Sequence, residues 1–270
     1  MNDFETNLIF NDETLTWSFS DKINIPNRAM NFGDGLFESM VFCKSKVRYS
    51  EKHLDRLKNG FSILGFPFEN IDIELIEKTL KKNFPPGDLR VRWNLFRSGS
   101  GTYTPSTNRL IQTLQIKKFS PPPRIKKTAF ICTRIKIFPT IWSNAKTLNS
   151  LPYVLANIER TDLKMDEVII LDNRGFISEA GSSNIFWMIG EEVFTPSLNS
   201  SCIAGVGRAV IIESLKNLGM EITEGLFFPE HLAKATTVWV SNAMGISYLE
   251  NIEGVEYSTK TLPFLEKLFN

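Results

Sequence analysis

Three consecutive prolines, Pro121–Pro123, stand near the middle of the 270-residue chain within the stretch "SPPPR". Proline lacks a backbone N–H and its ring obstructs a helix, so this run can enter neither a helix interior nor a sheet ladder. It forms a stiff, extended connector instead. The length allows two domains, and we therefore expect a small N-terminal α+β domain over 1–119, a Pro-rich linker over 120–124 and a large C-terminal domain over 125–270.

The N-terminal domain combines hairpins with amphipathic helices. Its expected elements are hairpins with turns at 11–12 and 44–46, a helix after Ser50, a helix over 71–84 and strands over 89–97 and 109–119. Ser50 can cap the first helix. Arg56 lies off the apolar stripe of that helix, which consists of Leu54, Leu57, Phe61 and Leu64.

The C-terminal domain places helices irregularly among strands, which indicates an α+β fold rather than a doubly wound sheet. Its expected elements are a strand over 127–135, a helix over about 150–163, hairpins over 167–178 and 184–196, helices over 206–218 and 229–235, strands over 220–227 and 237–242, and a C-terminal helix. We expect the 150–163 helix to pack on an inner stripe formed by Leu151, Val154, Leu155 and Ile158.

Composition excludes several classes of protein. With 42% hydrophobic and 23% charged residues and a formal charge of +1, the chain does not have the profile of a nucleic-acid binder. No apolar run approaches the roughly 18–20 residues of a membrane span, and the start lacks the pattern of a secretory signal. Three separated cysteines and two histidines suggest neither disulfides nor a metal site. A cytoplasmic location fits best.

Four features could carry chemistry, and each has an ordinary alternative. Lys146, ahead of a helix, could form an imine if it is partly desolvated, or it could be a surface lysine. The glycines of "CIAGVGR" open a helix and could cradle a phosphate, or form a common turn. Arg56 could bind that phosphate in a bidentate way or be solvated. Glu179 could be a functional carboxylate or a turn residue.

A resemblance favours the functional readings. Six motifs follow one another along the chain: "RAMNFGDGLFES", "HLDRL", "AKTLNSLPYVL", "SEAGSSNIF", "AGVGR" and "VSNAMG". In these motifs and in their order the chain resembles the class IV aminotransferase family, the fold-type IV pyridoxal 5′-phosphate (PLP) enzymes. The resemblance extends over nearly the whole chain. It implies the two-domain α+β architecture of D-amino acid aminotransferase-like proteins, PLP as cofactor, and a homodimer in which a loop of the second subunit completes each active site.

The resemblance also implies roles for individual residues. Lys146 would form the internal aldimine with PLP and shuttle the proton at the substrate's Cα. Glu179, in the pattern E-x-x-x-x-N-x-F, would bind the pyridine nitrogen and keep it protonated, so that the ring accepts electrons. The remaining cofactor contacts implied are Arg56 and the amides of Val206 and Gly207 on the phosphate, Ile203, and Asn242 on the phosphate or substrate side.

Three reactions of the family compete: branched-chain transamination, D-amino acid transamination and 4-amino-4-deoxychorismate lyase chemistry, which eliminates pyruvate to leave 4-aminobenzoate. Branched-chain enzymes typically place a tyrosine where this chain has Leu151. D-amino acid enzymes typically trap the substrate carboxylate with a tyrosine where this chain has Phe37, and with an arginine and a histidine in a loop where this chain offers Arg97 and Tyr103 without a histidine.

The pattern therefore favours the lyase, which "SNAMG" also resembles, although the lyases' usual Gly/Arg loop is shortened here. An amino-acid aminotransferase is the alternative, and Phe37, Arg97 and Tyr103 are the expected substrate contacts in either case. A PLP-binding protein without turnover is a third hypothesis. The candidate residues weigh against this hypothesis, because binding of PLP alone needs neither a proton shuttle, the role of Lys146, nor a partner of the electron sink, the role of Glu179.

Overall fold

The computed structural model of the chain describes residues 5–269 and divides into two compact units. Unit 1 comprises Met1–Ser120 and Ala145–Asn149, and unit 2 comprises Pro121–Asn144 and Ser150–Asn270. The division at Ser120 and Pro121 falls in the proline-rich stretch. The sequence analysis placed Lys146 in the C-terminal domain, whereas the structure groups its segment with unit 1, because the segment's main chain is hydrogen-bonded to a strand there.

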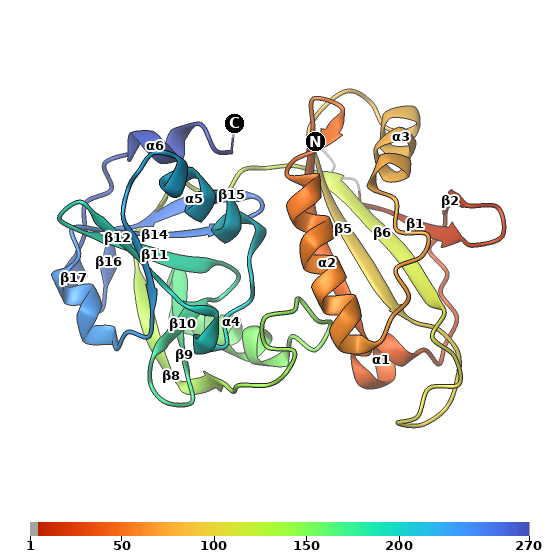
Figure 1. The fold of residues 1–270 in the computed structure, drawn as a ribbon, viewed down its shortest axis with the longest axis horizontal. Helices are drawn as coiled ribbons and strands as arrows, with labels where there is room; N and C mark the ends of the chain where they lie inside the picture. The colour runs from red at the N-terminus through yellow and green to blue at the C-terminus, as the bar shows by residue number, and fades with distance from the viewer. Residues whose placement is uncertain (1–4, 270) are drawn as a thin grey trace. The chain divides into compact units, whose positions relative to one another are not determined.

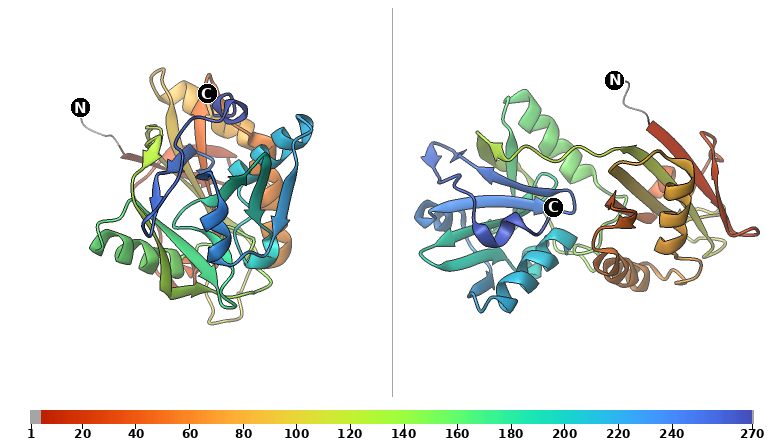
Figure 2. Two further views of the ribbon diagram at one scale, coloured as in Figure 1. Left: turned by 90° about the vertical axis from the view of Figure 1, so that its left-hand side faces the viewer. Right: turned by 90° about the horizontal axis from the view of Figure 1, so that it is seen from above.

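Unit 1 is an antiparallel sheet of six strands in the order β2-β1-β6-β5-β3-β4, with α2 and α3 packed on one of its faces (Figures 1 and 2). Its elements are β1 (Glu5–Asn11), β2 (Thr16–Phe19), α1 (Arg28–Phe32), β3 (Gly35–Cys43), β4 (Lys46–Val47), α2 (Ser50–Leu64), α3 (Ile73–Asn83), β5 (Leu89–Arg97) and β6 (Leu110–Lys118). Both hairpins expected in this half, β1–β2 and β3–β4, are confirmed.

Unit 2 contains two mixed sheets, in the orders β10-β9-β8-β16-β17 and β13-β12-β11-β14-β15-β7. Helix α4 lies against β8 and β9, and α5 packs against the second sheet (Figure 1). The strands are β7 (Ile125–Lys126), β8 (Ala129–Ile137), β9 (Glu167–Asp172), β10 (Ile177–Ala180), β11 (Asn184–Ile189), β12 (Glu192–Pro196), β13 (Ile222–Gly225), β14 (Thr237–Asn242), β15 (Gly245–Leu249), β16 (Asn251–Ile252) and β17 (Val255–Glu256). The helices are α4 (Leu151–Asp162), η1 (Leu198–Ser200), α5 (Val206–Asn217), η2 (Pro229–Lys234) and α6 (Pro263–Glu266).

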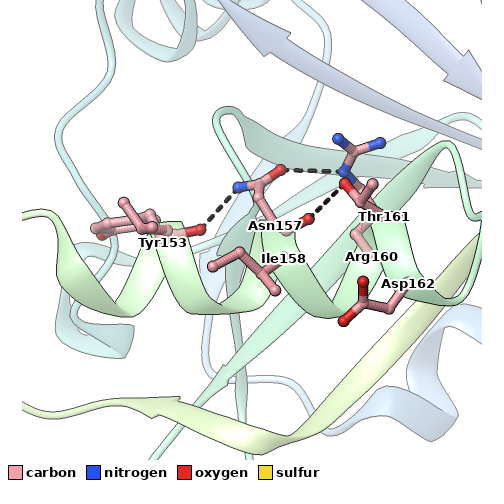
Figure 3. A pocket seen from close by; sticks show the side chains of 7 residues that line it. Tyr153, Asn157, Ile158, Arg160, Thr161 and Asp162 are labelled. Atoms are coloured by element: carbon pink, nitrogen blue, oxygen red, sulfur yellow. Dashed lines mark hydrogen bonds between the residues drawn. The ribbon is translucent and has the colours of Figure 1, made fainter.

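The prediction for the apolar stripe of α4 is wrong. Its expected inner residues are exposed: Leu151 60%, Val154 50%, Leu155 39% and Ile158 52%. The helix instead buries Ala156 against β8 and β9, with Tyr153 partly buried beside it. Figure 3 shows the surface pocket along this helix, lined from Tyr153 to Asp162. Spacing identified an apolar stripe, but a stripe does not specify what covers it.

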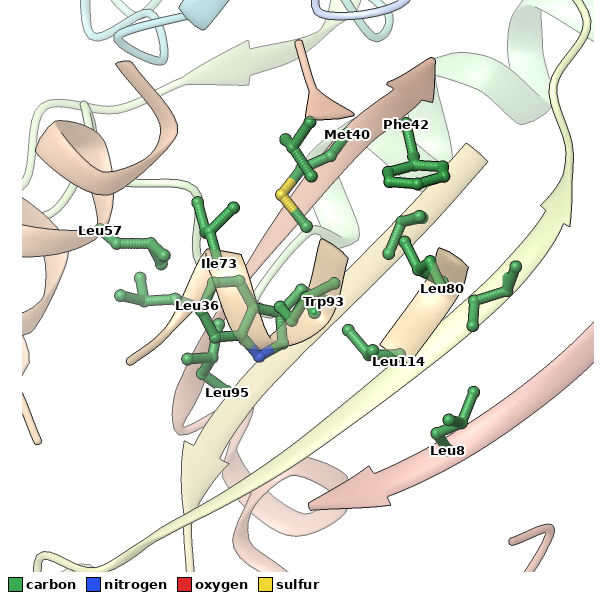
Figure 4. Packing of buried hydrophobic residues seen from close by; sticks show 14 of the residues in the cluster. Leu8, Leu36, Met40, Phe42, Leu57, Ile73, Leu80, Trp93, Leu95 and Leu114 are labelled. Atoms are coloured by element: carbon green, nitrogen blue, oxygen red, sulfur yellow. The ribbon is translucent and has the colours of Figure 1, made fainter. Parts of the chain in front are cut away.

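Strand alternation gives the unit 1 sheet two distinct faces. The face under the helices is apolar, and the sheet residues drawn in Figure 4 include Leu36, Met40, Trp93, Leu95 and Leu114, all at most 2% exposed. The alternate residues of β3, β5 and β6 point to the opposite face of the sheet, and this face carries polar side chains. One strand register therefore decides which side chains enter the core and which line a site.

Helix α2 begins one residue earlier than a Ser50 cap would require. Ser50 is its first helical residue, and Tyr49 occupies the N-cap position in the left-handed conformation, with φ of 58°. The predicted stripe of α2 is confirmed, because Leu57 and Phe61 are buried in the unit 1 core and Leu54 and Leu64 pack against it.

Within residues 5–269, no helix is long and apolar enough to cross a membrane. The same residues contain no cluster of three or more metal-ligating side chains of the His, Cys, Asp and Glu types. Cys43, Cys132 and Cys202 are free thiols.

Candidate active site

Lys146 is held by the start of β3. The amide of Phe37 donates to the carbonyl of Lys146 at 2.9 Å, and the amide of Leu148 donates to the carbonyl of Gly35 at 2.9 Å. Leu36 and Thr147 form the antiparallel bridge between these contacts. The main chain of Lys146 is thus as well defined as that of a strand, although it lies in a loop.

The Phe37 ring lies next to two cations. The Lys146 Nζ is 4.3 Å from the ring centroid, and the Arg92 guanidinium carbon is 3.7 Å from it. Arg92 also donates from Nε to Asn94 Oδ1 at 2.8 Å, which fixes its direction on the sheet face opposite the helices. Burial, with the like charge of Arg90 in second place, lowers the pKa of Arg92. Cation–π contacts of this kind orient a cation without neutralising it.

Glu38, on the helix side of β3, forms a buried cluster with two residues of α2. Its Oε2 lies 2.6 Å from His53 Nδ1, and both of its oxygens accept from Arg56, through Nε at 2.8 Å and through the Nη2 atom. Glu38 is 1% exposed and His53 0%. Arg56 is therefore not a solvated arginine, and one of its faces is committed to Glu38.

The charges of this cluster follow from its burial. Burial alone would raise the pKa of Glu38, but the charges of Arg56 and His53 and their hydrogen bonds outweigh it and lower the pKa to about 2. Burial lowers the pKa of His53 despite the carboxylate beside it. At pH 7 the ion pair is thus between Glu38 and Arg56, while His53 is neutral and donates from Nδ1. Its buried Nε2 has no hydrogen-bond partner among the described residues.

Arg97 and Tyr103, the expected substrate contacts, lie in different surroundings. Arg97 is 7% exposed, and its donors go to Asp34 and Asn108 and to the carbonyl of Leu64. Tyr103 is 88% exposed in the β5–β6 loop, with its ring 5.8 Å from that of Phe32. Among the arginines of β5, Arg92 is the one whose guanidinium contacts the Phe37 ring, which Lys146 also contacts.

Glu179 lies in β10 of unit 2 and is 3% exposed, so it is not a solvated turn residue. Its Oε1 accepts from the Tyr153 hydroxyl at 2.6 Å and from the amide of Ile203 at 3.0 Å. Cys202 lies nearby. Burial, followed by the charge of Glu179, raises the pKa of the Cys202 thiol to about 12, so the thiol stays neutral.

The spacing of the E-x-x-x-x-N motif has a structural reason. Glu179 in β10 and Asn184 in β11 both bind the main chain of Ile203: the carboxylate accepts from its amide, and the Asn184 Nδ2 donates to its carbonyl at 2.9 Å. A Cβ on Gly205 would lie 1.9 Å from Asn184 Oδ1. The two motif residues and the glycine therefore position one loop, the approach to α5.

The N-terminus of α5 has the features of a site that could hold an anion. No acidic side chain occupies its first turn, no side chain caps it, and its first amides have no acceptor within the helix. A Cβ on Gly207 would lie 2.6 Å from the carbonyl of Asn242 and 2.7 Å from Ser241 Oγ. That hydroxyl is buried and has no hydrogen-bond partner among the described residues. An orphaned hydroxyl beside open helix amides fits a phosphate group.

Asn242 itself is committed to its neighbours. Its Nδ2 donates to the Ser182 carbonyl at 3.2 Å and to Ser183 Oγ at 3.0 Å, and its Oδ1 accepts from the amide of Met244 at 2.8 Å. These contacts hold the β14–β15 turn against the β10–β11 turn. Any contact of residue 242 with a cofactor stays a prediction.

Sequence reasoning missed several residues that the structure brings into these groups. They are Glu38, His53, Arg92, Tyr153 and Ser241. Four of them had an available signal, because they lie inside the quoted motifs: Glu38 in "FGDGLFES", His53 in "HLDRL", Tyr153 in "AKTLNSLPYVL" and Ser241 in "VSNAMG". The motifs did not indicate the contact between the Tyr153 phenol and Glu179, because it spans 26 residues.

The two-unit α+β architecture is that of the fold-type IV PLP enzymes. A family model described as amino-transferase class IV matches residues 35–248. The chain belongs to the class IV aminotransferase family, whose members are PLP-dependent aminotransferases and lyases.

Its relatives include both reaction types. Aminodeoxychorismate lyase of Bacillus subtilis is 28% identical over 85% of this chain and 81% of its own length. Branched-chain-amino-acid aminotransferase-like protein 2 of Arabidopsis thaliana is 29% identical over 86% of this chain, which spans only 44% of that longer protein. Branched-chain aminotransferase from Thermoproteus uzoniensis has the same fold, with a TM-score of 0.86 over 99% of this chain and 92% of its own at 19% identity.

The Glu38 cluster generates a prediction about stability and pH. Glu38→Gln leaves a buried arginine without its counter-charge, and we expect the free energy of unfolding at pH 7 to fall by about 3–5 kcal/mol. Because the pKa of Glu38 is lowered on folding from 4.5 to about 2, its contribution is complete above pH 4.5 and is lost as the pH falls towards 2. The difference between wild type and variant should therefore narrow below pH 4.5.

Urea unfolding followed by tryptophan fluorescence between pH 3 and 7 measures this difference. Glu69→Gln, which removes an exposed carboxylate of unit 1, is the matched control and should unfold like wild type throughout. A difference for Glu38→Gln that is the same at pH 3 as at pH 7 would contradict the assignment of the charge.

Proposed function

We propose that this chain is a PLP-dependent enzyme that acts on an amino-acid-type substrate and carries the cofactor on Lys146. The observation that supports this most directly is the setting of Lys146. Its main chain is fixed by β3, and its ammonium lies against the Phe37 ring beside a second cation. Such a lysine is preorganised for one reaction partner rather than free to sample solvent.

The remaining residues then have complementary tasks. When bound, PLP supplies an electron sink for the electron pair left when a bond to the substrate's Cα breaks. Lys146 would hold and return the proton at that carbon. Glu179, fixed by its two donors, would hold the proton on the ring nitrogen. Arg56 and the amides of Val206 and Gly207 would bind the phosphate, which would also give the orphaned hydroxyl of Ser241 a partner.

For the specific reaction we propose 4-amino-4-deoxychorismate lyase activity, the release of pyruvate that leaves 4-aminobenzoate. Leu151 stands where branched-chain enzymes typically have a tyrosine, and its side chain is 60% exposed. The lyases of Bacillus subtilis and Vibrio harveyi also match over more than four fifths of their own length. Amino-acid aminotransferase activity is the second candidate, favoured by the branched-chain aminotransferase of Escherichia coli, 27% identical over 92% of this chain.

One set of assays on the PLP-loaded protein separates these candidates. We expect borohydride reduction and peptide mapping to place the pyridoxyl group on Lys146, and aminodeoxychorismate to yield pyruvate and 4-aminobenzoate in equal amounts. Lys146→Arg keeps the charge and should abolish both. Transfer of an amino group from D- or branched-chain amino acids to 2-oxoglutarate, without lyase turnover, would favour the second candidate. A label mainly on another lysine would overturn the whole assignment.

We also propose that Arg92 binds the substrate's carboxylate. Among the described residues no carboxylate lies within ion-pair distance of Arg92, although it is half-buried, and its guanidinium is held between Asn94 and the Phe37 ring that Lys146 also contacts. A desolvated cation without a counter-charge favours an anionic ligand. Phe37 then spaces the carboxylate site from the reactive amine.

Arg92→Ala should raise KM for the substrate turned over in these assays by about tenfold to a hundredfold, the size of one charge-assisted hydrogen bond. The affinity for PLP should not change. Arg92→Lys should recover part of the loss. The matched control is Arg90→Ala, which removes an exposed arginine two residues away on the same strand face and should leave KM unchanged. Equal KM values for wild type and Arg92→Ala would exclude this role.

We further propose that a second copy of this chain covers the exposed apolar stripe of α4. Contiguous exposed apolar surface commonly marks an interface. Other large apolar side chains of unit 2 are exposed in the segment just ahead of it, Phe138 at 64%, Ile141 at 81% and Trp142 at 41%. The family resemblance implies a homodimer. The stripe of α4 and the segment ahead of it give unit 2 an apolar surface for the dimer interface.

Ile158→Glu places a charge in the middle of the stripe. We expect light scattering on a sizing column to report about twice the chain mass of 30.8 kDa for wild type and about one chain mass for the variant. Leu218→Glu, at an equally exposed position after α5, should remain dimeric. A dimeric Ile158→Glu protein would place the interface elsewhere.

A further inference from the structure

Tyr153 makes a contact that neither the motifs nor the cofactor roles explain. It lies in the first turn of α4, and its hydroxyl donates to Glu179 Oε1 at 2.6 Å. Asn157, one turn later, donates to the Tyr153 carbonyl and to the Gly181 carbonyl, both at 2.9 Å. The first of these two bonds is drawn in Figure 3. The start of α4 is therefore tied to β10 and to the turn that follows it.

The phenol can act only as a donor in this contact. Burial, followed by the charge of Glu179 and the hydrogen bond to it, raises the pKa of Tyr153 well above its ordinary value. The hydroxyl thus keeps its proton at neutral pH. The thiol of Cys202 is neutral for the same reasons. Glu179 Oε1 therefore accepts from two donors that carry no charge, the Tyr153 hydroxyl and the amide of Ile203.

Two donors on one oxygen do two things to a carboxylate. They fix its rotation, and they stabilise its charged form relative to the protonated acid. A carboxylate opposite a ring nitrogen shares one proton with it, as either an ion pair or a neutral pair. Donors on the carboxylate favour the ion pair, in which the proton stays on the nitrogen. Removing one donor makes the carboxylate a stronger base and moves the proton towards it.

We propose that Tyr153 is a positioning residue that keeps Glu179 ionised and oriented, so that the ring nitrogen of bound PLP retains its proton. The proposal rests on the proposed function, because it requires PLP to face Glu179. The electron sink is then set by three groups in series: Tyr153, Glu179 and the ring.

Tyr153→Phe tests the proposal because it removes the hydroxyl and keeps the ring. The probe is PLP labelled with ¹⁵N in its pyridine ring, bound to Lys146 and observed by NMR, with Glu179→Gln as the reference for an unprotonated nitrogen. We expect the nitrogen signal of Tyr153→Phe to move from the wild-type position towards that of Glu179→Gln. The single-turnover rate should fall by about tenfold to a hundredfold, the size of one hydrogen bond to a charged group.

Tyr257→Phe is the matched control, since it removes a hydroxyl from another largely buried tyrosine of unit 2 and should leave the signal at the wild-type position. A signal for Tyr153→Phe that coincides with wild type, while that of Glu179→Gln moves, overturns the role of Tyr153 and leaves the proposed function intact. Absence of a pyridoxyl group on Lys146 in wild type overturns both.

A second measurement does not depend on the folding of Tyr153→Phe. The protein without PLP is labelled with ¹³C at Cζ of its five tyrosines and compared with its Glu179→Gln variant. Because the carboxylate accepts from one phenol, we expect one tyrosine resonance to move. Unchanged tyrosine resonances in the folded variant would overturn the proposal.

Discussion

The pairing of the Ala145–Asn149 segment with the start of β3 is the constraint on which the site depends. It brings Lys146 to the Phe37 ring through two main-chain hydrogen bonds of 2.9 Å. The pairing needs a glycine at 35, because a Cβ there would lie 2.5 Å from the carbonyl of Leu95. The "FGDG" motif is thus explained by the close approach of three chain segments, and hydrogen bonds to β3 set the position of Lys146.

A second constraint organises unit 2. Ile203 offers its amide to Glu179 and its carbonyl to Asn184, so two residues five positions apart in the β10–β11 hairpin hold one loop. That loop leads directly into α5 through Gly205, which has no room for a side chain. Orientation of the carboxylate and presentation of the helix amides are therefore coupled. A change at Asn184 should disturb phosphate binding and the carboxylate together.

Buried charge is used differently in the two units. In unit 1, Glu38 neutralises Arg56, while Arg92 stays a cation held only by Asn94 and an aromatic ring. In unit 2, the Oε1 of Glu179 accepts from two neutral donors, the Tyr153 hydroxyl and the amide of Ile203. Uncompensated charges in partly desolvated places are costly unless a ligand completes them. The site of Arg92 is thus suited to a group of negative charge.

The sequence alone determined most of the strands and helices, the α+β class and the family, because turn residues, periodicity and ordered motifs are local in the chain. It did not predict α1, β7 or β15 to β17. It also marked Lys146, Glu179 and the glycines before α5 as candidate site residues, since these lie within motifs. The partners of these residues depended on the tertiary structure. The contact of Tyr153 with Glu179 joins residues 26 apart, and that of Arg56 with Glu38 joins residues 18 apart.

The same distinction explains the one error in the predicted packing. Apolar spacing in α4 shows that the helix has a stripe, but burial depends on what lies against it, and α4 turns Ala156 rather than the stripe towards β8 and β9. Local sequence determines which residues share a helix face, because 3.6 residues make one turn. Only the topology decides whether that face meets a sheet or remains exposed, because this depends on segments distant in the chain.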